Sequence, residues 1–105
     1  MRFRAKVHTP MYDHNDKKYI RLVIPEKYAE IIRNIHTRKD TPFDPLNGQV
    51  LTIKVPFRYR RVMCEVKGRP MQSLVTDDEI IAEIRFKGYW DTSGYSWVLV
   101  SCSSD

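Results

Sequence analysis

Residues 2–24, RFRAKVHTPMYDHNDKKYIRLVI, contain two alternating patterns of apolar and polar side chains. Apolar residues take every second position in each arm: Phe3, Ala5 and Val7 in the first, and Ile20, Leu22 and Ile24 in the second. A period of two is typical of a β-strand with one face on a core. The polar run at 13–16 predicts a turn. The stretch therefore predicts a β-hairpin with strands at 2–12 and 18–24.

The same alternation returns in later segments, which predict four further strands at residues 51–60, 62–66, 80–87 and 95–101. Pro56 indicates an edge or a bulge in the first of these. In the last strand, either Tyr95 and Trp97 or Val98 and Val100 face inward, because successive residues alternate. Between the hairpin and these strands, residues 37–48 are rich in turn-forming residues and predict an irregular segment.

One helix is expected between the hairpin and the irregular segment. Pro25 suits a first helical turn, and the helix should end near His36. The spacing of Tyr28, Ile31, Ile32 and Ile35 gives an apolar stripe of helical period. The sequence therefore predicts a mainly β protein with one helix, forming a single domain over residues 1–105. The expected architecture is a curved antiparallel sheet or a small barrel of five to six strands.

Composition limits the class of protein. In 105 residues, 42% are hydrophobic, which excludes a disordered tail. No apolar run is long enough for a transmembrane helix, and the first ten residues show no apolar signal segment. The two isolated cysteines, Cys64 and Cys102, are typical of reduced thiols, with Cys64 expected in the core. We therefore expect an intracellular protein, cytoplasmic or nuclear, with no membrane partner.

The outward strand positions are strongly basic. There are 18 Lys and Arg against 13 Asp and Glu, a formal net charge of +5. The outward cations of the expected strands are Arg2, Arg4, Lys6, Arg21, Lys54, Arg58, Arg60, Arg85 and Lys87. If these faces converge, they form one basic surface that suits a phosphate backbone. The alternative is an ordinary solvated face.

Aromatic residues are interleaved with these cations. Single-strand binders combine cations with rings on which bases stack. The candidate rings are Tyr59, Tyr89 and Trp90. Phe57 and Phe86 are assigned to the core instead, from their alternation with apolar neighbours. Tyr89 and Trp90 are adjacent in a strand, so we expect one of them to face solvent, and Trp90 has the larger ring.

Residues 83–100, EIRFKGYWDTSGYSWVLV, resemble the closing hairpin of small phage and viral OB-fold proteins that bind single-stranded DNA. The resemblance implies an OB-like barrel and a DNA partner. In that fold the helix usually lies between the third and fourth strands, whereas the helix expected here follows the second.

The sequence contains no catalytic or metal-binding signature. His8, His14 and His36 have no metal-ligand spacing, and glycine-rich phosphate loops are absent. We therefore expect no catalytic residues, no metal and no cofactor, although a small basic ribonuclease could act without a motif.

The predicted function is non-catalytic binding of single-stranded nucleic acid, with DNA favoured over RNA as the ligand. The alternative is a small interaction subunit or inhibitor whose basic face binds an acidic protein surface. A homodimer through a strand edge is the expected form of any self-association.

Overall fold

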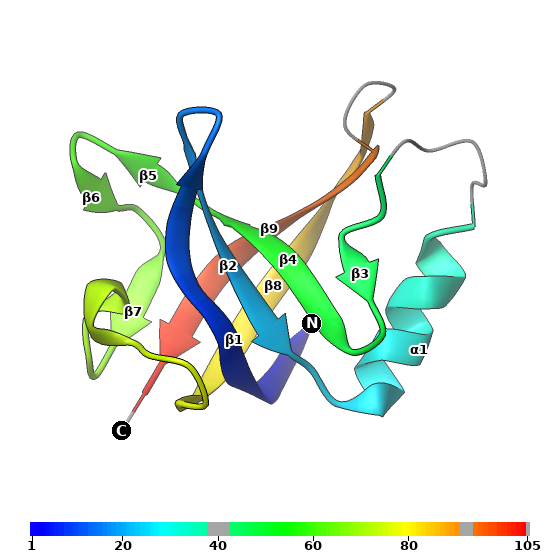
Figure 1. Cartoon of the computed structure of the whole chain (residues 1–105), viewed down its shortest axis with the longest axis horizontal. Helices are drawn as coiled ribbons and strands as arrows, with labels where there is room; N and C mark the ends of the chain where they lie inside the picture. The colour runs from blue at the N-terminus through cyan, green and yellow to red at the C-terminus, as the bar shows by residue number, and fades with distance from the viewer. Residues whose placement is uncertain (38–42, 91–93, 105) are drawn as a thin grey trace.

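The structure is a computed structural model that describes residues 1–37, 43–90 and 94–104, with the backbone alone of Tyr89 and Trp90. The strands are β1 (Arg2–His14), β2 (Lys17–Val23), β3 (Leu46–Asn47), β4 (Val50–Val55), β5 (Phe57–Arg58), β6 (Arg61–Val62), β7 (Glu65–Lys67), β8 (Glu79–Trp90) and β9 (Gly94–Ser103). The helices are α1 (Glu26–Ile35) and the 3-10 turn η1 (Met71–Ser73). The mainly β class with one α-helix is confirmed (Figure 1).

Five of the strands close into a barrel. Around it the order is β4-β2-β1-β8-β9, and β9 then pairs with β4. Four of these neighbour pairs are antiparallel, and the closing pair of β4 with β9 is parallel. The expected small barrel is therefore confirmed, with a mixed rather than a wholly antiparallel sheet. Short strands β3 and β7 extend the sheet beyond the barrel.

In the N-terminal hairpin, the side chains predicted to face the core are buried. Phe3, Ala5 and Val7 are buried, and so are Ile20 and Leu22 of β2. A two-residue turn, Asn15–Asp16, joins β1 to β2, and both residues have positive φ, 51° and 65°. Asn and Asp tolerate this conformation better than most residues, so the turn chemistry agrees with the strand pattern.

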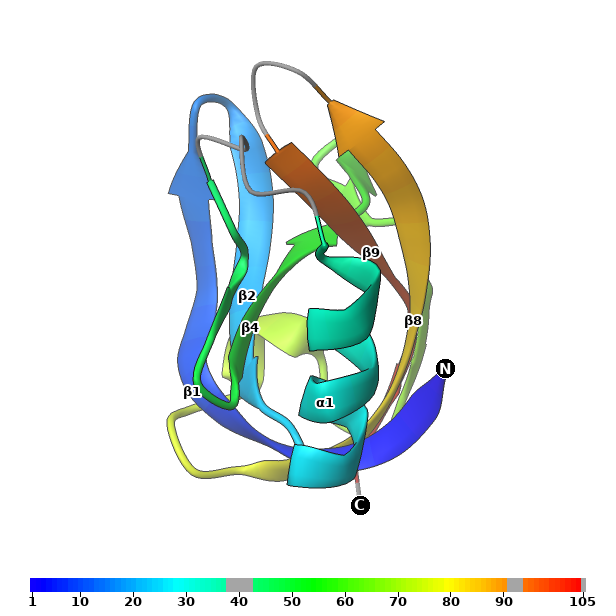
Figure 2. The same cartoon turned by 90° about the vertical axis from the view of Figure 1, so that its right-hand side faces the viewer.

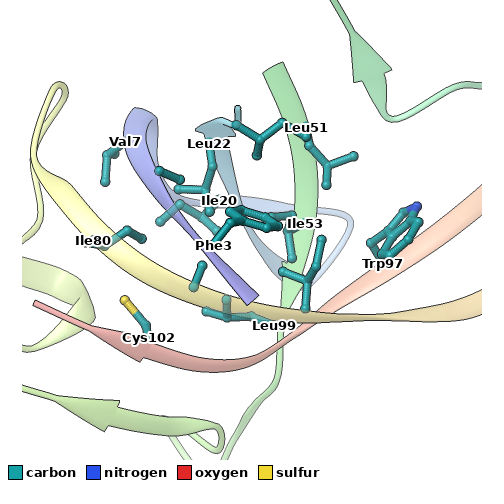
Figure 3. Close-up of a cluster of buried hydrophobic side chains, with 14 of the residues drawn as sticks. Phe3, Val7, Ile20, Leu22, Leu51, Ile53, Ile80, Trp97, Leu99 and Cys102 are labelled. Atoms are coloured by element: carbon teal, nitrogen blue, oxygen red, sulfur yellow. The ribbon is translucent and has the colours of Figure 1, made fainter. Parts of the chain in front are cut away.

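The core fills the barrel from all five strands, as Figure 3 shows. Ile20, Leu22, Leu51 and Ile53 have no exposed surface. Each such side chain stabilises the fold by roughly 1.5–3 kcal/mol relative to an exposed one. In β9 the alternation places the aromatic residues inward, because Trp97 is 3% exposed whereas Val100 is 36% exposed.

The prediction of one continuous strand over 51–60 is wrong. β4 ends at Val55, and the chain passes through Pro56 into a separate two-stranded sheet of β5 and β6. Proline has no N–H to continue the barrel ladder, which explains the break. The assignment of Phe57 to the core is also wrong, since it is 36% exposed, whereas Phe86 packs against the core as expected.

The expected stripe of helix α1 is only half correct. Ala29 and Ile32 are buried, whereas Ile31 and Ile35 are 42% and 38% exposed. The helix packs against the barrel through Tyr28, whose ring centroid lies 5.0 Å from that of Phe3. It lies between the β2–β4 side and the β8–β9 side of the barrel (Figure 2). None of the helices in the described residues is long and apolar enough to span a bilayer.

The strand expected at 62–66 is divided into β6 and β7, with Cys64 between them. Cys64 is half-buried and packs against the core, and Cys102 is buried within it. Burial, with a smaller contribution from Cys64, raises the pKa of the Cys102 thiol to about 11. This thiol is therefore protonated at neutral pH and behaves as a small apolar residue.

Candidate functional site

A groove of about 850 Å³ opens where β4 and β9 meet, and both outward side chains and the inward-facing Tyr95 and Trp97 line it. The described residues that line it are Lys17, Tyr19, Phe43, Pro45, Thr52, Lys54, Pro56, Phe57, Arg58, Met63, Arg85, Lys87, Tyr95, Ser96, Trp97 and Val98. Five of these residues are cationic, and none is acidic. The groove therefore offers positive charge together with apolar and aromatic surface.

Strand pairing builds the floor of this groove. Tyr19 of β2 is opposite Lys54 of β4, Lys54 is opposite Val98 of β9, and Val98 is opposite Arg85 of β8. Side chains at paired positions share one face of the sheet, with Cβ atoms about 5 Å apart. One row across four strands thus contains, in order, an aromatic ring, an ammonium group, an apolar side chain and a guanidinium group.

Lys54 lies in a field of like charges. Partial burial lowers its pKa, and the nearby ammonium groups of Lys17 and Lys87 lower it further. Like charges held together in a partly dry site favour any ligand that neutralises them. The electrostatics of the groove therefore favour an anion.

Lys87 owes its position to an irregularity in β8. Phe86 is paired with Trp97, and Gly88 with Ser96, so Lys87 is the extra residue of a β-bulge. The neighbouring Gly88 has φ of 121°, a conformation that side-chain-bearing residues rarely adopt. Arg85 and Lys87, two positions apart on β8, are both exposed cations.

Behind the groove, an aromatic cluster connects the barrel to the end of α1. The His36 side chain is 1% exposed and stacks on Tyr95, with ring centroids 4.0 Å apart. The indole Nε1–H of Trp97 donates to His36 Nε2 at 2.9 Å. Indole nitrogen is only a donor, so His36 carries its proton on Nδ1 and donates it to Asp44 Oδ1 at 2.8 Å. The ring must be neutral to hold both bonds.

This arrangement predicts a pH-dependent stability. Burial lowers the pKa of His36 below its ordinary value of 6.5, against the opposing charge of Asp44. The unfolded chain then binds the proton more tightly than the folded chain. The contribution of His36 to the free energy of unfolding is therefore complete above pH 6.5 and is lost as the pH falls through the pKa of the folded state. Thermal melts between pH 8 and 5 should show this loss.

His36→Gln provides the comparison for these melts, because it removes the titrating ring. The difference in melting temperature between the wild type and His36→Gln should narrow as the pH falls. His8→Asn, which removes an exposed histidine, should leave the profile unchanged. A wild-type protein that becomes more stable below pH 6.5 would contradict the neutral His36 ring.

The structure brings together some of the predicted site residues and separates others. Lys54, Arg58, Arg85 and Lys87 line the groove. Those outside its lining are Arg2, Arg4, Lys6, Arg21, Tyr59 and Arg60. The groove therefore gathers only part of the predicted basic set, because a closed barrel turns its outer faces in different directions.

The residues outside the groove have other surroundings. Arg2 and Lys6 of β1 are paired with Glu83 and Glu79 of β8, so this basic face meets acidic neighbours. Arg21 lies over the ring of Tyr12, 5.2 Å from its centroid. Arg60 lies in the turn between β5 and β6, so it does not share a face with Lys54 as expected.

The predicted stacking residues Tyr89 and Trp90 belong by backbone to the end of β8, but their side chains lie outside the described residues. The expectation that one ring faces solvent stays a prediction. Sequence reasoning did not place Lys17, Phe43 or Trp97 in the site. Lys17 could have been predicted, because residues at every second position share a face, which places Lys17 with Tyr19 and Arg21 on the outer face of β2.

Within the residues that the structure describes, no group of three or more His, Cys, Asp and Glu side chains is placed to hold a metal ion. Comparisons of the chain with models of protein families, with curated proteins and with solved structures found no match.

Proposed function

We propose that this protein binds single-stranded nucleic acid, DNA before RNA, in the groove over β2, β4, β8 and β9, without catalysing a reaction. The observation that carries the proposal is the lining of the groove: among its described residues are five cations and no carboxylate, beside rings and apolar side chains. Cations pair with phosphates, and rings receive unpaired bases.

The mixed lining favours a single strand over a duplex. A duplex presents phosphates to a protein surface and keeps its bases stacked inside, so it would leave the apolar wall of the groove without a partner. A single strand offers phosphates and base faces together. Phe43, Phe57 and Met63 are 50%, 36% and 50% exposed, so the apolar wall is accessible.

We further propose that the barrel is an OB-fold. Support comes from the order of its strands: the first, second and third barrel strands follow one another, the fifth pairs with the third, and the fourth lies between the fifth and the first. OB-folds are five-stranded Greek-key barrels that bind oligonucleotides over their second and third strands. The groove residues Tyr19, Lys54 and Thr52 come from the equivalent strands, β2 and β4. Helix α1, however, lies between these two strands rather than in the usual place.

The test is a fluorescence titration with labelled single-stranded DNA, single-stranded RNA and duplex DNA of one sequence at one salt concentration. The proposal expects the single strands to bind more tightly than the duplex, with DNA ahead of RNA. Equal affinity for duplex and single strand would reject the role of the apolar wall. Absence of binding to all three would favour the alternative, an acidic protein partner.

Self-association through a strand edge stays a prediction. The edges of the main sheet are β3 and β7, with 2 and 3 residues. Such short edges offer few backbone groups for pairing with a second chain.

A further inference from the structure

The hairpin Phe57–Val62, formed by β5 and β6, is a small sheet separate from the barrel, and it projects beyond the end of β4 (Figure 1). Its base is anchored: Met63 N donates to Pro56 O at 2.9 Å, and Lys18 Nζ lies 4.8 Å from the Phe57 ring centroid. Phe57 and Arg58 line the groove, so the hairpin continues one wall of the groove away from the barrel.

The turn of this hairpin contains residues that are unfavourable for its backbone conformation. Its two-residue turn is Tyr59–Arg60, and both residues have positive φ, 54° and 63°. Turns of this kind favour Asn, Asp or Gly, and a bulky residue with positive φ is strained. The turn of the β1–β2 hairpin, with similar φ values, uses Asn15–Asp16. The same chain therefore uses favoured residues at one such turn and not at the other.

A second unfavourable feature lies next to the turn. Arg58 is paired directly with Arg61 across the two strands, and like charges at such positions repel. Tyr59 is 77% exposed, more than any other large hydrophobic residue that the structure describes. Strain, repulsion and an exposed ring together point to a ligand contact, because none of them contributes to folding.

The charges and the ring indicate the ligand. The sequence of the hairpin, FRYRRV, carries three arginines, one tyrosine and no carboxylate. Two opposed guanidinium groups suit a phosphate between them, since arginine binds phosphate in bidentate fashion. A solvent-facing tyrosine at the tip suits the face of an unpaired base.

Resting on the proposed function, we propose that this hairpin is a second contact element for a strand that extends beyond the groove. Arg58 and Arg61 hold a phosphate, and Tyr59 stacks on a base. The ligand class is thus a single strand longer than the groove accommodates. A short oligonucleotide occupies the groove alone, and a longer one gains affinity from the hairpin.

The test compares the wild type with the double variant Tyr59→Asn/Arg60→Gly, which gives the turn its favoured residues. Labelled oligothymidylates of about 4 and about 16 nucleotides cover the range of lengths that OB-folds bind. We expect the variant to bind the short strand as the wild type does and the long strand about tenfold more weakly. Its melting temperature should rise by roughly 4–8 °C, because the strain is removed.

Single variants and a vesicle assay complete the design. Tyr59→Phe should retain the affinity for the long strand, because it keeps the ring, whereas Tyr59→Asn should lose it. The inference is overturned by unchanged long-strand affinity in the double variant, by an equal loss for both lengths, or by a lower melting temperature. It is also overturned if the double variant binds both oligonucleotides as the wild type does and loses only the binding of phosphatidylserine vesicles, because the hairpin would then contact a lipid headgroup. A wild type that binds neither strand instead removes the proposed function itself.

Discussion

Reversing the charge of Lys54 and Lys87 should weaken binding of single-stranded DNA by about a hundredfold or more. Both lysines line the groove, and burial together with the ammonium groups of Lys17 and Lys87 lowers the pKa of Lys54. Hydrogen bonds to charged groups contribute roughly 1.5–3 kcal/mol each, so two lost phosphate contacts give this effect. The measurement is a titration of Lys54→Glu/Lys87→Glu with a labelled strand at fixed salt.

The matched control for this variant is Lys6→Glu/Lys27→Glu. It lowers the formal net charge of +5 by the same four units, but Lys6 and Lys27 lie outside the lining of the groove. We expect the control to weaken binding only slightly. If both double variants lose the same affinity, net charge rather than the groove attracts the strand. The groove variant should keep its melting temperature, because the new carboxylates lie among the remaining groove cations, Lys17, Arg58 and Arg85.

Replacing Trp97 by alanine should have the largest effect on stability. Trp97 is 3% exposed, its ring lies 5.0 Å from that of Phe86, and it donates a hydrogen bond to His36. Figure 3 shows it at one end of the barrel core. Truncating a buried aromatic residue costs about 3–5 kcal/mol of unfolding free energy, a large part of the 5–15 kcal/mol that most domains have. Denaturant unfolding followed by circular dichroism measures it.

Two further variants separate packing from the hydrogen bond. Trp97→Phe keeps an aromatic ring but leaves His36 Nε2 without its donor, so it should cost about 1–3 kcal/mol. Tyr59→Ala removes a 77% exposed ring and should stay within about 0.5 kcal/mol of the wild type. A loss below about 1 kcal/mol for Trp97→Ala would show that the cluster around His36 does not hold the end of the barrel.

Local patterns predicted the barrel strands because burial there follows a period of two. Phe3, Ala5 and Val7 alternate with polar residues, and their burial repeats that alternation. Pairing is a different matter. The parallel contact of Lys54 with Val98 joins segments 44 residues apart, and no local pattern encodes it. Because this contact closes the barrel, the groove above it could not be placed from the sequence.

The sequence also misled where a pattern continued past a break. Alternation over 51–60 runs through Pro56, although β4 ends at Val55 and the exposed Tyr59 lies in the turn between β5 and β6. In α1, the helical period offered Ile31 and Ile35 as core residues. Ile32 is buried as predicted, but only the position of the barrel determines that Ala29, rather than Ile31 or Ile35, is buried with it.

The central claim is that five cations of the groove, Lys17, Lys54, Arg58, Arg85 and Lys87, bind the phosphates of a single strand. The most direct measurement is the dependence of single-stranded DNA affinity on salt, taken from about 50 to 300 mM NaCl. Each phosphate neutralised on a single strand contributes about 0.7 to the logarithmic slope, so five contacts predict a slope near −3.5. A slope close to zero would contradict the claim, because a strand held by phosphate contacts must release counterions.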